Sequence, residues 1–154
     1  MFYFAYGSNM NLDQMRERKV SYQNPRKAFL MNYKLGFTKT SERYNNIGVA
    51  DIIESKGNFV EGVLYEVTEE GMANLDKFEG IEQNVYKRVK VVVQLESGEE
   101  LETITYKIIN EDKPFIPPAK EYMDKIIKGA ETHRLSKNYI QKLKAIPLKE
   151  ITND

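Results

Sequence analysis

Residues 26–39, RKAFLMNYKLGFTK, carry the pattern that decides the class of fold. Large apolar side chains recur at every second position of this stretch: Phe29, Met31, Tyr33, Leu35 and Phe37. Because successive side chains of a β-strand point to opposite faces of its sheet, these five residues fall on one face of a strand. The stretch therefore predicts a long strand, and the rest of the chain must supply strands for it to pair with.

Similar strand patterns lie on both sides of this stretch. Apolar, aromatic and β-branched residues predict further strands at 2–6, 47–53, 58–67, 86–96 and 101–109, with a polar loop at 41–46. The last two of these strands are separated by Ser97-Gly98, a pair typical of a hairpin turn. We therefore expect a sheet of about six strands that is mainly antiparallel.

Helical patterns occur near the start, in the middle and at the end of the chain. Asn9 or Asn11 is placed to cap a short helix, and Thr68 to cap a second helix that ends near Gly80. Two more helices are expected after the KPFIPP loop at 113–118. The first places Tyr122, Ile126, Ile127 and Ala130 on one stripe, and the second, at 138–146, brings together Ile140, Leu143 and Lys144.

This order of elements predicts an α+β fold with a mainly antiparallel sheet that can close into a barrel. The 154 residues fit a single domain, which we assign to residues 1–148. Residues 149–154 are expected to form a frayed tail.

Composition narrows the classes of function. The 23 basic and 23 acidic residues cancel, so no overall field attracts nucleic acid or an anionic membrane, and a small-molecule ligand is favoured. The absence of cysteine excludes disulfides, thiolate metal sites and cysteine nucleophiles. No leader pattern and no long apolar run is present, so a cytoplasmic protein outside the membrane is expected. The oligomeric state is not predicted.

The N-terminal stretch FYFAYGSNMN, residues 2–11, contains an abrupt polar turn. Its aromatic strand ends at Tyr6, and Gly7 then permits backbone angles that a side chain would disfavour. A junction between a strand and a helix points several backbone N–H groups at one spot. Such a spot binds an anion or the oxygen of a polarised carbonyl.

Few residues are candidates for catalysis. Glu79 stands between Phe78 and Gly80 at the expected helix end, and a carboxylate in apolar surroundings has a pKa raised toward the range useful for proton transfer. A solvated glutamate is the simpler interpretation of this pattern, and Asp76 and Glu82 are equally available.

Other catalytic schemes find less support in the sequence. Ser8 lacks the surroundings of a nucleophile elbow, and His133, the single histidine, is expected to be exposed near a helix end. The sequence shows no cluster of metal ligands. The basic residues Lys87, Arg88 and Lys90 are read as a solvated sheet face.

Four blocks in this order and spacing resemble the γ-glutamylcyclotransferases. They are FAYGSNM, GVLYEVTEEGMANLDKFEGI, VYKRVKVVV and PPAKEYMDKIIKGAE, and the resemblance runs from Phe2 to Ile146. It implies a small mixed, mainly antiparallel β-barrel with flanking helices. It also implies an enzyme that converts a γ-glutamyl amino acid or amine to 5-oxoproline and the free amine, without metal or cofactor.

The resemblance also assigns residues to the site. The family's acid/base glutamate corresponds to Glu79, although Phe78 stands where glutamine is common. The substrate-binding turn corresponds to Tyr6, Gly7, Ser8, Asn9 and Met10, with Met10 in place of a common leucine. The pocket tyrosines correspond to Tyr86 and Tyr122, and less firmly to Tyr106.

This resemblance implies a mechanism in which the substrate's own α-amine attacks its γ-carbonyl and closes a five-membered ring. Glu79 would take a proton from the amine and return it to the leaving group, while N–H groups of the turn hold the γ-glutamyl group. Three alternatives stay open. They are a γ-glutamylamine substrate, a γ-glutamyl group removed in a biosynthetic pathway, and a non-catalytic binding module on the same fold.

Overall fold

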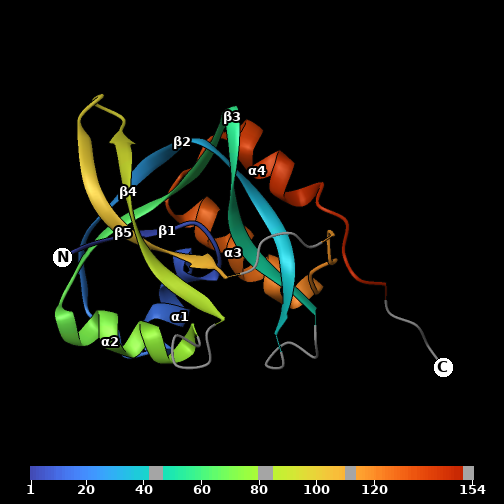
Figure 1. Ribbon diagram of the computed structural model, residues 1–154, viewed down its shortest axis with the longest axis horizontal. Helices are drawn as coiled ribbons and strands as arrows, with labels where there is room; N and C mark the ends of the chain where they lie inside the picture. Colours follow the sequence, from blue (N-terminus) through green and yellow to red (C-terminus); the bar gives the residue numbers. More distant parts are fainter. Residues whose placement is uncertain (42–46, 80–84, 110–113, 151–154) are drawn as a thin grey trace.

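Two long strands, β2 (Tyr22–Ser41) and β3 (Ile47–Val67), form the largest part of the sheet (Figure 1). They pair antiparallel from Tyr22↔Val67 to Ser41↔Ile47. This computed structural model describes residues 1–41, 47–79, 85–109 and 114–150. The expected loop at 41–46 and the stop signal at Gly80 therefore lie, except for Ser41, outside the described residues.

Five strands of the described chain close into a barrel in the order β1-β3-β2-β4-β5. The short strand β1 (Phe2–Ala5) pairs antiparallel with β3 and parallel with β5 (Glu100–Ile108). Strand β4 (Tyr86–Leu95) forms the predicted hairpin with β5, and Gly98 adopts a φ of 91° in the turn between them. The predicted α+β barrel is confirmed, and the one parallel contact makes its sheet mixed.

The number of strands differs from the prediction. Residues 47–53 and 58–67 belong to the single strand β3, so the barrel has five strands rather than six. Gly57, at a φ of 87°, allows β3 to continue through a polar segment that the sequence pattern treats as a break.

The regular alternation of residues 26–39 does not define one face of β2. Ala28 and Leu30 are buried, whereas Met31 is 48% exposed. The pairing with β3 shifts between Met31 and Tyr33, and Asn32 has a φ of 66°. At this irregularity four residues of β3, 55–58, lie opposite the single residue Asn32 of β2. Beyond it the buried positions of β2 change from even to odd numbers, so that Phe37 is buried.

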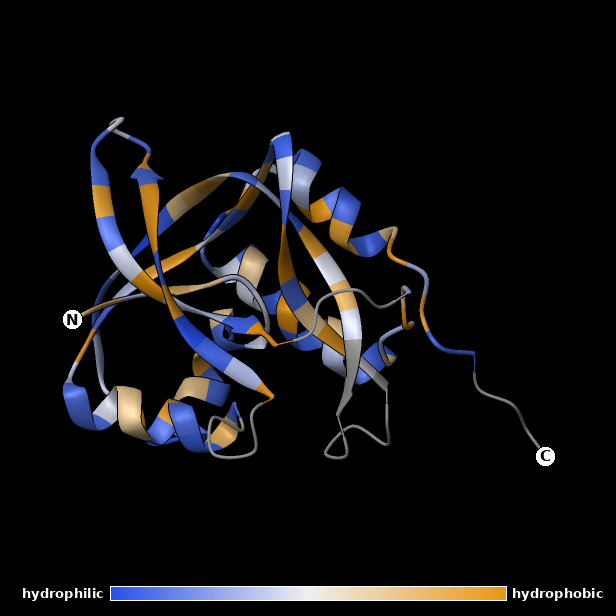
Figure 2. Ribbon diagram, viewed as in Figure 1, coloured by the Kyte–Doolittle hydropathy of each residue, from blue (hydrophilic) through white to orange (hydrophobic). Residues whose placement is uncertain are grey.

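Helices cover the barrel, as Figures 1 and 2 show. A 3₁₀ turn, η1 (Ser8–Met10), leads into α1 (Leu12–Glu17), and the side chain of Asn11 caps α1. The predicted cap Thr68 begins α2 (Glu69–Phe78), whose Met72 and Leu75 are fully buried. Hydrophobic and hydrophilic residues alternate along these helices (Figure 2), and the buried residues include Met15 of α1 as well as those of α2.

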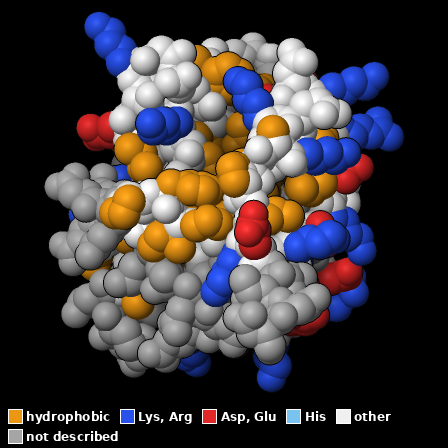
Figure 3. Space-filling model, turned by 90° about the vertical axis from the view of Figure 1, so that its right-hand side faces the viewer, with side chains coloured by type: hydrophobic (Ala, Val, Ile, Leu, Met, Phe, Trp, Pro, Cys, Tyr) orange, Lys and Arg blue, Asp and Glu red, His pale blue; other side chains and the backbone are white. Residues whose placement is uncertain are grey.

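The last two helices are α3 (Lys120–Thr132) and α4 (Lys137–Lys144). The predicted stripe of α3 is confirmed at Tyr122, Ile126 and Ala130, while α4 buries Tyr139 and Leu143 rather than Ile140. No helix of the described residues is long and apolar enough to cross a membrane. In Figure 3 one face carries a band of hydrophobic side chains, with Lys and Arg around its edge.

Candidate active site

The turn between β1 and α1 is held from one side by β3 and α3. A Cβ atom on Gly7 would lie 3.3 Å from the Cβ of Ala50 and 3.7 Å from the hydroxyl of Tyr122. Gly7 therefore lets the turn lie close to both neighbours. The N–H of Met10 donates to the carbonyl of Gly7 at 3.1 Å, which closes the 3₁₀ turn.

Helix α3 packs against the back of the turn through Gly129. A Cβ atom there would lie 2.6 Å from the carbonyl carbon of Met10. The side chain of Met10 is fully buried, and its N–H is used inside the turn. The Met10 N–H is therefore engaged within the turn, and the Met10 side chain anchors the turn to the core.

The carbonyl groups of the turn also face the elements that hold it, β3 and the end of α3. The Tyr65 hydroxyl donates to the carbonyl of Asn9 at 3.0 Å, and Nε2 of His133 lies 3.0 Å from the carbonyl of Met10. Because a carbonyl only accepts, Nε2 of His133 carries a proton. His133 is half-buried at the end of α3, not exposed as expected, and burial lowers its pKa.

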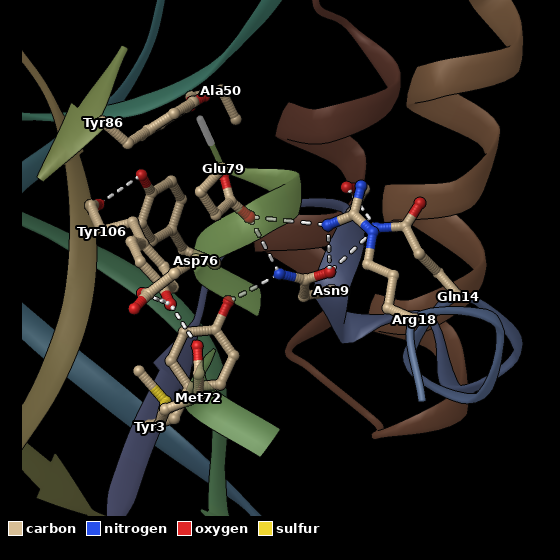
Figure 4. A network of polar contacts seen from close by, with 12 residues as sticks. Tyr3, Asn9, Gln14, Arg18, Ala50, Met72, Asp76, Glu79, Tyr86 and Tyr106 are labelled. Carbon is tan, nitrogen blue, oxygen red and sulfur yellow. Dashed lines mark hydrogen bonds and ion pairs between the residues drawn. The ribbon is translucent and has the colours of Figure 1, made fainter. Parts of the chain in front are cut away.

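Asn9 is the centre of a buried polar network, drawn in Figure 4. Its Oδ1 accepts from Nε2 of Gln14 at 2.9 Å and from a guanidinium nitrogen of Arg18 at 2.8 Å. Its Nδ2 donates to the hydroxyl of Tyr3 at 2.8 Å and to Oε1 of Glu79 at 3.1 Å. The amide of Asn9 therefore connects the turn directly to the candidate acid/base.

Glu79 lies at the C-terminal end of α2, as the sequence predicts. Its N–H donates to the carbonyl of Leu75 at 2.9 Å, and its side chain is only 15% exposed. Oε1 of Glu79 lies 3.5 Å from the guanidinium of Arg18. The interpretation of Glu79 as a fully solvated glutamate is therefore wrong.

Asp76, the nearest alternative carboxylate, belongs to another set of contacts. It accepts two hydrogen bonds from Arg88, at 2.9 and 2.6 Å, and one from the Tyr106 hydroxyl at 2.7 Å. Arg88 is thus the partner of Asp76 and not simply part of a solvated sheet face. Glu82, the other alternative, lies outside the described residues.

Three buried tyrosines from different elements gather around the turn. Tyr86 donates to the carbonyl of Ala50 at 2.7 Å, and Tyr122 accepts from the N–H of the same residue at 2.9 Å. Tyr6 donates to the carbonyl of Tyr106 at 2.6 Å. Burial, together with the charges of Asp51 and Glu79, raises the pKa of Tyr6 well above its ordinary value. Burial is also the main cause of the raised pKa of Tyr86, so both phenols are neutral near pH 7.

Sequence reasoning missed Tyr3, Arg18 and Asp51. Asp51 is fully buried on β3, and its Oδ1 accepts from the N–H of Ile108 at 3.0 Å. An acidic residue inside the apolar run IGVADII is a signal that could have identified it. Arg18 lies in the charged run RERK, where nothing in the local pattern distinguishes it from its exposed neighbours.

A separate hollow of about 680 Å³ has a different lining. It is lined by His133, Arg134, residues 25–27 of β2, and Leu95, Glu96, Ser97 and Glu99 around the β4–β5 turn. None of these residues belongs to the network of Asn9 and Glu79. We place the candidate active site at that network, because it joins Glu79 to the YGSN turn.

Comparisons with known proteins agree on one family. The model of the AIG2-like family matches residues 59–143. The γ-glutamylcyclotransferase of Bos taurus is 34% identical over 148 residues, covering 94% of this chain and 77% of the relative. The human γ-glutamylcyclotransferase is 33% identical over 159 residues, covering 97% and 80%. A solved structure of a γ-glutamyl cyclotransferase superimposes with a TM-score of 0.89 at 29% identity, covering 100% of this chain and 92% of the other.

Proposed function

Since the chain belongs to the AIG2-like family and to the γ-glutamylcyclotransferases, we propose that it converts a γ-glutamyl amino acid or amine to 5-oxoproline. The free amine is the second product. One observation of the structure supports this most strongly: a mostly buried carboxylate, Glu79, is hydrogen-bonded to Asn9 of the YGSN turn. The residues that we assign as acid/base and as substrate-binding turn are thus in direct contact.

The reaction needs one acid/base because the substrate supplies its own nucleophile. The α-nitrogen bonds to the γ-carbonyl carbon and closes the ring, and the bond from that carbon to the leaving nitrogen then breaks. Orienting the two reacting groups of one molecule can lower the barrier by about 7–11 kcal/mol. What is left for the protein is to hold the substrate, move a proton and stabilise the developing oxyanion.

Glu79 moves the proton in this proposal. The substrate's α-amine is an ammonium near neutral pH, with an ordinary pKa of about 8, so it must lose a proton before it attacks. The Glu79 carboxylate takes that proton, and the neutral carboxylic acid gives it to the departing amine. After the attack the ring nitrogen still carries a second proton to lose. The carboxylate of Glu79, ionised again, takes it and passes it to the released amine, so the two protons lost by the α-nitrogen equal the two gained by the leaving nitrogen.

Donors around the turn stabilise the oxyanion and the bound glutamyl group. We assign this role to the N–H groups of Gly7, Ser8 and Asn9, because the Met10 N–H is used within the turn. An oxyanion donor is worth about 3 kcal/mol. The neutral phenols of Tyr86 and Tyr122 are assigned to the same pocket, and both lie at Ala50, next to Gly7.

The test is to incubate the protein with a panel of γ-glutamyl compounds and to measure 5-oxoproline by mass spectrometry. The panel includes γ-glutamyl amino acids, γ-glutamylamines and ε-(γ-glutamyl)-lysine, and the amine released identifies the substrate class. We expect 5-oxoproline in the presence of EDTA. Binding of these compounds without 5-oxoproline from any of them would instead indicate a binding module.

A further inference from the structure

Arg18 is a buried cation beside the candidate acid/base. It lies at the C-terminal end of α1, and its side chain is only 8% exposed. Its guanidinium is 2.8 Å from Oδ1 of Asn9, 3.5 Å from Oε1 of Glu79 and 4.9 Å from the centre of the Phe78 ring. Burial of an ionised side chain is costly unless partners compensate it, and here the partners are residues 78 and 79 and the YGSN turn.

At its position in the fold, Glu79 is favoured as a carboxylate by a nearby cation. Glu79 ends α2, where the helix dipole contributes a partial negative charge that disfavours an ionised carboxylate. Glu79 also interacts electrostatically with the phenols of Tyr3, Tyr6, Tyr86 and Tyr106. Burial keeps these phenols neutral. Arg18 supplies the positive charge within ion-pair distance that favours the carboxylate.

Arg18 also determines how the Asn9 amide is oriented. A guanidinium only donates hydrogen bonds and a carboxylate only accepts them, whereas Gln14 can turn its amide over and Tyr3 can donate or accept. With Arg18 on one side and Glu79 on the other, one orientation of Asn9 satisfies both, and it points Nδ2 at Glu79.

We infer that Arg18 is the positioning residue of this enzyme, which keeps Glu79 ionised and locks Asn9 toward it. Arg18 acts through these two residues and touches no reacting atom. This inference rests on the proposed function, because it assigns Arg18 a role in a reaction that Glu79 carries out.

The experiment compares Arg18→Met and Arg18→Lys with the wild type. Arg16→Met is the matched control, since Arg16 is on the same helix, is exposed and forms a surface ion pair with Asp13. For each protein, kcat and KM for the best γ-glutamyl substrate are measured across pH, together with Tm. The rise of kcat/KM with pH reports the ionisation of the base in the free enzyme.

Arg18→Met should lower the maximal kcat on the order of 10²-fold, with a smaller change in KM, because the reacting groups are displaced. It should also move the acid limb of kcat/KM to higher pH, because the carboxylate loses its counter-charge. Arg18→Lys keeps the charge but loses the planar fork, so its acid limb should stay in place while kcat falls partly. Arg16→Met should match the wild type.

Two results would overturn the inference. One is a lower Tm for Arg18→Met with unchanged kcat and acid limb, which would leave Arg18 a purely structural residue. The other is an acid limb displaced to the same extent in Arg18→Lys and in Arg18→Met, which would exclude a role for the charge. If Arg18→Met does not fold, Arg18→Lys is the test. An unchanged acid limb with a lowered kcat supports the inference, and a displaced acid limb or an unchanged kcat overturns it. Failure of the proposed function is distinct, since the wild type would then form no 5-oxoproline.

Discussion

The packing of α3 against the turn predicts that Gly129→Ala impairs catalysis more than folding. The new Cβ would lie 2.6 Å from the carbonyl carbon of Met10, where ordinary contacts begin at 3.4 Å. Backbone atoms at the contact cannot rotate aside, so the turn must move by about 0.8 Å, the difference between these distances. Overpacking of this kind costs about 1–3 kcal/mol, against a gain of about 1 kcal/mol from alanine in a helix.

The expected result is a decrease of at most about 2 kcal/mol in the free energy of unfolding, which corresponds to a Tm lower by up to about 8 °C. A displacement close to 1 Å at the substrate-binding turn should lower kcat/KM on the order of 10²-fold. Both quantities are measured on the purified protein, by thermal unfolding and by 5-oxoproline formation. Glu131→Ala, at an exposed position of the same helix, is the control and should change neither.

A Gly129→Ala protein with wild-type kcat/KM and a raised Tm would refute this reasoning. It would mean that only helix propensity responds to the substitution, and that α3 does not fix the position of the turn.

Two further predictions concern a tyrosine and the single histidine. Tyr122→Phe removes the acceptor of the buried Ala50 N–H, so Tm should fall through a loss of about 1–3 kcal/mol, and kcat/KM should fall severalfold because the hydroxyl lies beside Gly7. A lowered Tm at unchanged kcat/KM would mean that Tyr122 has only a structural role in the core. Burial lowers the pKa of His133, so its neutral form stabilises the fold above its ordinary pKa of 6.5, and this stability is lost as pH falls toward the lowered pKa. His133→Gln should therefore lose less Tm between about pH 7 and about pH 5 than the wild type does, and an equal loss would contradict this assignment.

The sequence predicted the barrel because its elements depend on local patterns. The hairpin at Ser97-Gly98, the cap at Thr68 and the stripe of α3 each follow from neighbouring residues. The phase of β2 could not be read in the same way, because the irregularity at Asn32 depends on the pairing with β3. Long-range pairing also makes β3 one strand where the pattern suggests two.

The site shows the same division between local pattern and tertiary contact. The YGSN turn and Glu79 could be identified from the resemblance of four sequence blocks. Arg18 could not, because its burial depends on the contact between α1 and the end of α2, which no local pattern reports. Asp51 was detectable in principle as a charge in an apolar strand, but its partner Ile108 is 57 residues away.

The central claim is that Glu79 is the acid/base of a cyclotransferase, and Glu79→Gln tests it most directly. Glutamine has nearly the same shape and can still accept from Asn9, but it cannot take a proton from the substrate's ammonium. The rate of 5-oxoproline formation from the best γ-glutamyl substrate is measured for the wild type, Glu79→Gln and the control Asp76→Asn. We predict that Glu79→Gln loses about 10²–10⁴-fold in kcat, while Asp76→Asn stays active. The Tm of Glu79→Gln should fall, because buried Arg18 loses its counter-charge, but the protein should still fold. Near-normal turnover in Glu79→Gln, with Asp76→Asn inactive, would contradict the account.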